Sequence, residues 1–242
     1  MIAENLNFAA VGVAGQMQNG KDTIADYLYS AILDRRPIQS PFNSSSIFNL
    51  SYRRDAFAAG VKKVFCDTFG VDMDFIEKWK TIPEPPPGFL KPVRQSLQFI
   101  GDGFREIQGD VWLNKPFLNR EDSVIISDAR YINELDKIFS VNGTNILVWH
   151  PERENDDPNG SEKQIKPAVD FWKKTNVEGD TGDFLLNLDP NELTSLPEGA
   201  VLVHLFIRND GTVQDLYKKI DEIVVPYIKN RYKAIALGTF KG

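Results

Sequence analysis

The clearest chemical pattern in the chain is a glycine-bearing segment that follows an apolar run. It reads Gly15-Gln16-Met17-Gln18-Asn19-Gly20-Lys21-Asp22-Thr23. Glycines allow a backbone to turn its N–H groups inward around phosphate oxygens, and the amino end of a following helix adds a favourable dipole. Lysine in such a loop reaches the outer phosphates, and a hydroxyl in the first helical turn holds Mg²⁺. The segment therefore predicts a phosphate-binding loop formed by Gly15, Gln18, Asn19, Gly20, Lys21, Asp22 and Thr23.

The segment departs from the usual phosphate-loop motif at one position. The usual motif has serine or threonine directly after the lysine, whereas this chain has Asp22 there and its hydroxyl one residue later, at Thr23. Adenylate-kinase-like loops also place threonine two residues after the lysine, so the departure favours a kinase over a general nucleotidase. The alternative is a plain strand–helix turn with an exposed lysine. The order of strand, loop and helix favours phosphate binding over that alternative.

A second pattern closes the apolar run at 124–126, where Asp128-Ala129-Arg130 follows. In an open parallel sheet, ligands bind beyond the carboxyl ends of the strands. A carboxylate at such an end can hold Mg²⁺ through water, and an arginine beside it can neutralise a phosphoryl group in transfer. We therefore expect a metal site at Thr23 and Asp128, and a catalytic role for Arg130. The alternative is an ion pair at the surface of a strand end.

Several other cations have no evident structural work in the sequence. Phosphoryl transfer between two nucleotides gathers negative charges, so its sites need fixed lysines and arginines. Arg94, Gln98 and Asp102 recur at intervals of four and share one polar helix face. Most surface cations are merely solvated, and that is the alternative for each of these. The candidates are Arg54, Lys62, Arg94 and Arg153.

Other reactive residue types show no catalytic spacing. The two histidines, His150 and His204, fit neither a Ser–His–Asp arrangement nor a zinc site. The single cysteine, Cys66, excludes an internal disulfide, fits a reducing cytoplasm and is predicted to pack in a core. Trp112 is predicted to pack as well, although an aromatic ring could stack on a base.

Apolar runs alternate with helical patterns along the chain, which predicts an α/β fold. Such alternation favours a parallel sheet covered by helices on both faces. We expect one domain over residues 1–242, with a mobile flap or lid at about 151–183, and loops at 35–52 and 81–92. Thr212 is expected to cap the last helix, with Val213, Leu216, Ile220 and Ile223 facing inward. The predicted strands lie at 8–13, 124–126, 145–149 and 201–207, and the predicted helices lie at 24–32 and 57–69 and begin near 92, 131 and 212.

Charge and hydropathy argue against binding to nucleic acid and against a membrane span. The formal net charge is -6, which disfavours stable binding to nucleic acid. No run of about 18 apolar residues occurs, so no membrane span is expected. The first residues lack the basic region of a signal peptide, and we expect a cytoplasmic protein.

The chain resembles the phage-type deoxynucleoside monophosphate kinases, a branch of the P-loop nucleoside monophosphate kinases. The resemblance covers most of the chain in order, and its fold is P-loop NTPase-like. The segments that carry it are Gly15 to Tyr27, Phe57-Ala58 with Val61-Lys62, Val93-Arg94 through Gly101-Asp102, Trp112, Asp128-Ala129-Arg130 with Asn133-Glu134, Ser161-Glu162 and Asn209-Asp210-Gly211-Thr212.

The resemblance implies an activity, co-substrates and site residues. The family converts deoxynucleoside monophosphates to diphosphates with ATP and Mg²⁺, which supplies precursors for DNA synthesis. By resemblance, the loop from Gly15 to Thr23 binds ATP, Lys21, Asp128 and Arg130 act in catalysis, and Arg153 closes over the phosphates. It also implies small-molecule nucleotides as partners and, for a phage protein, the host cytoplasm; a homodimer stays open. The implied acceptor-binding residues are Met17, Val61, Lys62, Arg94, Asp102 and Arg130.

Three alternatives stay open at this point. One is another small-molecule kinase of the same architecture, such as a dephospho-coenzyme A kinase-like enzyme. A second is a nucleotide-binding protein that has kept the loop without turnover. A third, a nucleic-acid kinase, is disfavoured by the acidic balance and by the lack of a basic stripe.

Overall fold

The computed structural model describes residues 8–16, 18–33, 52–118, 122–153, 160–175, 197 and 199–236. These residues fall into two compact units. We call residues up to 55 and from 119 onward the sheet unit, and Ala56–Leu118 the helical unit. The single domain that the sequence predicts over residues 1–242 stays a prediction. No helix within the described ranges is long and apolar enough to cross a membrane.

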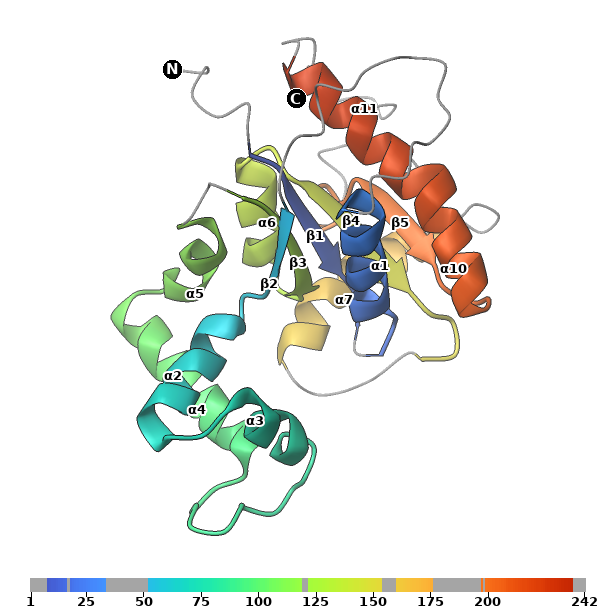
Figure 1. Cartoon of the computed structure of the whole chain (residues 1–242). Coiled ribbons are helices and arrows are strands. Elements are labelled where there is room, and N and C mark those ends of the chain that lie inside the picture. Colours follow the sequence, from blue (N-terminus) through green and yellow to red (C-terminus); the bar gives the residue numbers. More distant parts are fainter. Residues whose placement is uncertain are drawn as a thin grey trace. The chain divides into compact units, whose positions relative to one another are not determined.

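A parallel sheet forms the centre of the sheet unit (Figure 1). Its strand order is β2-β3-β1-β4-β5, so the first strand of the chain lies in the middle, and every neighbouring pair is parallel. Strands buried on both faces read as continuous apolar runs, which is why β1, β3 and β4 were predictable. The strands are β1 (Ala10–Ala14), β2 (Tyr52–Asp55), β3 (Ser123–Ala129), β4 (Thr144–Trp149) and β5 (Leu205–Arg208).

Helices cover both faces of this sheet, as the sequence predicts (Figure 1). Val11 and Val13 of β1 share one apolar cluster with Ile24 of α1 and with the last helices of the chain. Side chains alternate along a strand, so Gly12 faces the other side. A Cβ atom at Gly12 would collide there with Ile138 of α6. The covering elements are α1 (Lys21–Leu33), α10 (Val213–Lys219), the π-helical segment η2 (Ile220–Val224) and α11 (Val225–Ala236) on the first face, and α6 (Ile132–Ser140) on the second.

Part of the predicted flap is a packed helix. Helix α7 (Gly160–Thr175) buries one side of its length, where the sequence predicts a polar loop or flap. A Cβ atom at Gly199 would lie 3.4 Å from both Ala168 of α7 and Ile132 of α6, so the two helices are neighbours. Charged residues and Pro167 break up the apolar pattern of α7, which hides its helical period in the sequence. Residues 154–159 and 176–183 of the predicted flap lie outside the described residues. The buried side chains are Ile165, Ala168, Val169 and Trp172.

The helix pair at the end of the chain begins where the sequence predicts and then shifts its register. Thr212 caps α10, since its hydroxyl accepts the N–H of Asp215 at 3.2 Å. Val213 is 49% exposed, so the prediction that it faces inward is wrong. Residues 220–224 form a π-helical turn, whose wider winding brings Val224 and Val225 into the core and leaves Ile223 only half-buried.

The helical unit is built around a small aromatic and aliphatic core. Phe65, Ile76 and Val93 are buried at its centre, one from each of three helices. The predicted helices at 57–69 and from 92 are confirmed as α2 and α4, whereas α3 was not predicted. The proline-rich stretch 81–92 is non-helical, as predicted. The elements are α2 (Ala59–Phe69), α3 (Met73–Trp79), α4 (Val93–Ile107), α5 (Val111–Asn114) and the 3₁₀ turn η1 (Lys115–Phe117).

Candidate phosphate-binding site

The predicted phosphate loop joins the central strand β1 to helix α1. Gly15 directly follows β1 with φ 145°, and a Cβ atom there would collide with the carbonyl oxygen of Val148. Gln18 has φ 63° and Gly20 has φ 98°, so the backbone reverses within a few residues. Met17 lies outside the described residues. Strand, turn and helix thus occur in the order that a phosphate-binding loop requires.

Lys21 is the first residue of α1, and its side chain lies inside the loop. The residue is 6% exposed, and Nζ donates a hydrogen bond to the carbonyl oxygen of Gln16 at 2.5 Å. The lysine is therefore not the exposed side chain of the alternative interpretation. A buried ammonium group and a helix amino end are both features that favour an anion.

Asn209, directly after β5, braces the loop from the neighbouring side. Its Nδ2 donates to the carbonyl oxygen of Asn19 at 3.0 Å, and its backbone N–H donates to the carbonyl oxygen of Trp149 at 2.8 Å. A Cβ atom at Gly20 would lie 2.6 Å from Asn209 Nδ2, so this close approach requires glycine. The side-chain amide of Asn19 is fully buried, and neither of its polar atoms has a hydrogen-bond partner. The loop therefore holds unsatisfied polar atoms, which a bound ligand or water would satisfy.

The carboxyl end of β3 carries the second predicted pattern. The β1–β3 register runs from Gly12 opposite Ile126 to Ala14 opposite Ala129, so β3 contains one extra residue. This β-bulge falls at residues 127–128, and bulges of this kind redirect a side chain at the edge of a sheet. Asp128, which lies in the bulge, is half-buried.

Glu134 holds the turn that carries Arg130. The Oε2 atom of this buried carboxylate accepts the backbone N–H of Arg130 at 2.7 Å and that of Tyr131 at 3.0 Å. Sequence reasoning named Glu134 only as part of a motif. Its place four residues after Arg130, at the start of α6, is the signal that could have found this role.

Two further arginines reach the loop region from other strands. Arg153 follows β4, and its Nη1 donates to the carbonyl oxygen of Gln18 at 2.7 Å. Arg54 of β2 pairs with Asp22 at 3.3 Å and with Asp26, both on α1. The structure thus brings Arg153 to the loop and Arg54 to the first turns of α1.

Thr23 and Asp128, the two predicted metal residues, carry the oxygen ligands that Mg²⁺ prefers. Among the described residues, no group of three or more His, Cys, Asp and Glu side chains could hold a metal by itself. Mg²⁺ commonly takes only one or two protein oxygens, with phosphate oxygens and water as its other ligands. Arg54 hydrogen-bonds the residues that precede Thr23 and Asp128 in the chain, so these two predicted metal residues belong to neighbouring backbone segments.

The other predicted acceptor residues lie in the helical unit. Val61 is buried, and Lys62 Nζ pairs with Glu77 Oε1 at 3.0 Å. Hydrogen bonds from Lys80 and Lys62 hold the pKa of Glu77 below its ordinary value, against the smaller opposing effect of burial.

Helix α4 presents the predicted polar face to solvent. Arg94, Gln98 and Asp102 are all exposed, and Asp102 Oδ1 accepts from Arg105 at 3.0 Å. Trp112 is buried and donates to the carbonyl oxygen of Gly101 at 2.9 Å, which confirms its predicted packing role.

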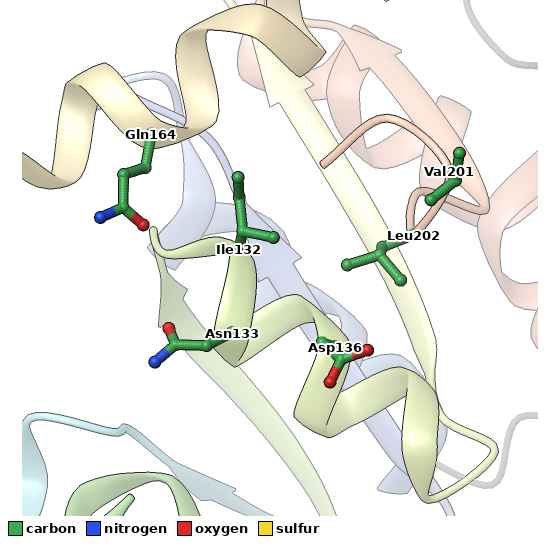
Figure 2. A pocket seen from close by; sticks show the side chains of 6 residues that line it. All are labelled: Ile132, Asn133, Asp136, Gln164, Val201 and Leu202. Atoms are coloured by element: carbon green, nitrogen blue, oxygen red, sulfur yellow. The ribbon is translucent and has the colours of Figure 1, made fainter. Parts of the chain in front are cut away.

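A separate pocket of about 640 Å³ lies between α6, α7 and the segment before β5 (Figure 2). No residue of the predicted phosphate site lines it. Asn133, Asp136 and Gln164 are exposed at its rim, and Figure 2 shows Asn133 and Asp136 on the same helix. The lining residues are Ile132, Asn133, Asp136, Gln164, Val201 and Leu202.

The strand order and the loop after β1 together define an α/β fold of the P-loop NTPase-like class, as predicted. No protein-family model matches the chain, and no curated protein matches its sequence. Among solved structures, a shikimate kinase from Acinetobacter baumannii, in complex with shikimate, is 14% identical with a TM-score of 0.39, over 91% of this chain and 94% of that one. A shikimate kinase from Aquifex aeolicus is 13% identical with a TM-score of 0.26, over 70% of this chain and 99% of that one. Likenesses this distant indicate no substrate.

Proposed function

We propose that the chain is a P-loop kinase that uses ATP and Mg²⁺ to phosphorylate a deoxynucleoside monophosphate. The observation that carries the proposal is the loop after β1, which encloses the buried ammonium group of Lys21 at the amino end of α1. Such a loop binds the β- and γ-phosphates through backbone N–H groups, and its lysine contributes a fixed positive charge.

The residues around the loop suit phosphoryl transfer, which needs positioning and charge neutralisation more than covalent participation by the protein. Arg153 lies at the rim of the loop, where its remaining N–H groups can reach a terminal phosphate. Glu134 accepts the backbone N–H of Arg130, so the turn after β3 that carries the Arg130 guanidinium is held in place. Thr23 and Asp128 would hold Mg²⁺, which supplies a bridge between phosphate oxygens and offsets their charge.

The acceptor assignment rests on the sequence resemblance. A monophosphate acceptor requires fixed cations, and Arg94, exposed on the polar face of α4, is the first candidate. Lys62 is the second candidate, a cation that pairs with Glu77. We retain Met17, Val61, Asp102 and Arg130 as further acceptor residues by the same resemblance.

The first experiment is an assay of ADP release from ATP and Mg²⁺ with a panel of acceptors. The panel contains all common deoxynucleoside and ribonucleoside monophosphates, dephospho-coenzyme A, and shikimate as an alcohol that is not a nucleotide. Lys21→Met removes the ammonium group and keeps most of the side-chain volume. Lys63→Met is the matched control, because Lys63 is an exposed surface lysine that pairs with Asp67.

The outcomes separate the proposal from its alternatives. Turnover with deoxynucleoside monophosphates that is lost in Lys21→Met and kept in Lys63→Met supports the proposed function. Turnover only with another acceptor would identify a different small-molecule kinase. ATP binding without a phosphorylated product from any acceptor would identify a nucleotide-binding protein without turnover.

A further inference from the structure

Arg54 joins two elements of the candidate site through a single guanidinium group. Its Nη1 pairs with Asp26, and its Nη2 lies 3.3 Å from Asp22 Oδ1 and donates to Ser127 Oγ at 2.9 Å. The first two partners belong to α1 and the third to β3. The aspartates stand one helical turn apart, so Arg54 ties the first two turns of α1 to the end of β3.

Two of these partners directly precede the predicted metal residues. Asp22 comes before Thr23, and Ser127 comes before Asp128. Ser127 is buried and belongs to the β-bulge of β3, where the register to β1 shifts. The contacts of Arg54 therefore link the segment that carries the Thr23 hydroxyl to the segment that carries the Asp128 carboxylate.

The neighbouring arginine provides a natural comparison. Successive side chains on a strand point to opposite faces of the sheet. Arg53 accordingly pairs with Asp55 of its own strand. Removal of either arginine changes the net charge equally, so a difference between the two variants measures geometry and not total charge.

We propose that Arg54 is a positioning residue for magnesium binding, an inference that rests on the proposed function. Its planar guanidinium holds Asp22, Asp26 and Ser127 at once and thereby keeps Thr23 and Asp128 at the spacing that one ion requires. A lysine at this position keeps the charge but lacks the fork that reaches three partners. Residues that orient metal ligands in this way typically change metal affinity by about 10- to 100-fold when they are removed.

The test measures ATP binding by calorimetry with Mg²⁺ and, separately, with EDTA, for the whole chain and its variants Arg54→Ala, Arg54→Lys and Arg53→Ala. We expect Mg²⁺ to tighten ATP binding by the wild type and by Arg53→Ala. In Arg54→Ala the Mg²⁺-dependent increase in ATP affinity should be about tenfold smaller than in the wild type. The ATP Kd measured in EDTA should stay within about twofold of the wild-type value. Arg54→Lys should lose most of the same gain. Ser127→Ala, which removes one link and little volume, should lose part of the gain and guards against a misfolded Arg54 variant.

Each other outcome overturns the inference in a distinct way. If Arg54→Ala and Arg53→Ala lost the same amount of Mg²⁺-dependent ATP affinity, only the total charge would matter to magnesium binding. An equal loss of affinity in Mg²⁺ and in EDTA would mean that Arg54 supports α1 in general and not the metal. A wild-type chain that binds no ATP would overturn the proposed function, and the inference with it.

Discussion

Arg153 Nη1 donates a hydrogen bond to the backbone carbonyl oxygen of Gln18 at 2.7 Å, which joins the segment after β4 to the loop after β1 across 135 residues of sequence. Gln18 has φ 63°, in the left-handed region that residues other than glycine rarely adopt. Such a conformation costs about 1 kcal/mol or more and persists only where surrounding contacts hold it. Arg153 supplies one of those contacts, so it stabilises the loop as well as presenting charge to it.

Arg153→Ala should therefore reduce catalysis without unfolding the chain. Loss of one charge-stabilising donor at a reacting phosphate typically lowers kcat by about 100-fold. Arg153 is exposed and gives the loop one hydrogen bond, so its removal should lower the free energy of unfolding by only about 1 kcal/mol. Steady-state kinetics with the accepted monophosphate and a thermal melt provide the two readouts. Lys63→Ala, which also removes an exposed cation, should match the wild type in both, and wild-type kcat in Arg153→Ala would remove Arg153 from the site.

Gly20→Ala should destabilise the fold, because the position allows no side chain. Its φ of 98° disfavours every residue with a Cβ atom, and that atom would lie 2.6 Å from Asn209 Nδ2. The two effects together should cost about 1–3 kcal/mol of unfolding free energy, measured by urea denaturation. The displaced loop should also bind ATP more weakly.

Gly103→Ala is the matched control for that substitution. Gly103 lies within α4, and nothing lies within 4 Å of the Cβ atom it would gain. Alanine in a helix is more stable than glycine by about 0.5–1 kcal/mol, so this variant should gain stability. The change in unfolding free energy should therefore have opposite signs in Gly20→Ala and Gly103→Ala. A stable Gly20→Ala with normal ATP affinity would contradict the close approach of Asn209 to the loop.

Glu134→Ala should loosen the turn at Arg130. The substitution leaves the two half-buried backbone N–H groups of Arg130 and Tyr131 without their acceptor, which should cost about 1 kcal/mol or more of unfolding free energy. Glu134→Gln keeps one amide oxygen and should retain more stability and more activity than the alanine variant. Urea denaturation and kcat, measured on both variants, test this order. Equal activity in Glu134→Ala and Glu134→Gln would show that the braced turn does not matter to Arg130.

The parts of the fold that could be predicted from the sequence are those whose signal is local. Apolar runs marked β1, β3 and β4 because strands buried on both faces contain few polar residues. The loop could be predicted because its glycines and Lys21 stand at fixed offsets between a strand and a helix.

Elements whose residues find partners far along the chain were missed. Strand β2 reads Tyr-Arg-Arg-Asp and is too polar to resemble a buried strand. Arg54 meets its partners Asp22, Asp26 and Ser127 only after folding. Asn209 likewise shows its role only where β5 brings it beside Asn19. Hydrogen bonds of this kind have no periodicity, so pattern reasoning does not detect them.

His204 makes the stability of the fold depend on pH. The ring is buried, and its Nδ1 accepts the backbone N–H of Asn145 at 3.0 Å. The backbone N–H of His204 donates to the Asn145 carbonyl oxygen at 2.9 Å. Burial, with a smaller contribution from the charge of Arg231, lowers the pKa of His204 from 6.5 to about 3. The folded chain therefore keeps this histidine neutral where the unfolded chain protonates it.

The sign of the effect follows from that difference in pKa. Below pH 6.5 His204 binds a proton in the unfolded state but stays neutral in the folded state. The free energy of unfolding therefore falls as the pH drops toward about 3. At pH 5 this single group should cost roughly 2 kcal/mol relative to pH 7.5. Urea denaturation at both pH values measures this loss of unfolding free energy.

His204→Gln keeps an acceptor for Asn145 and should be less stable than the wild type at pH 7.5. On acidification to pH 5 it should lose roughly 2 kcal/mol less than the wild type. His150→Gln, which removes the chain's other histidine, is the control and should follow the wild type; an unchanged acid loss in His204→Gln would mean that the buried ring is not its source.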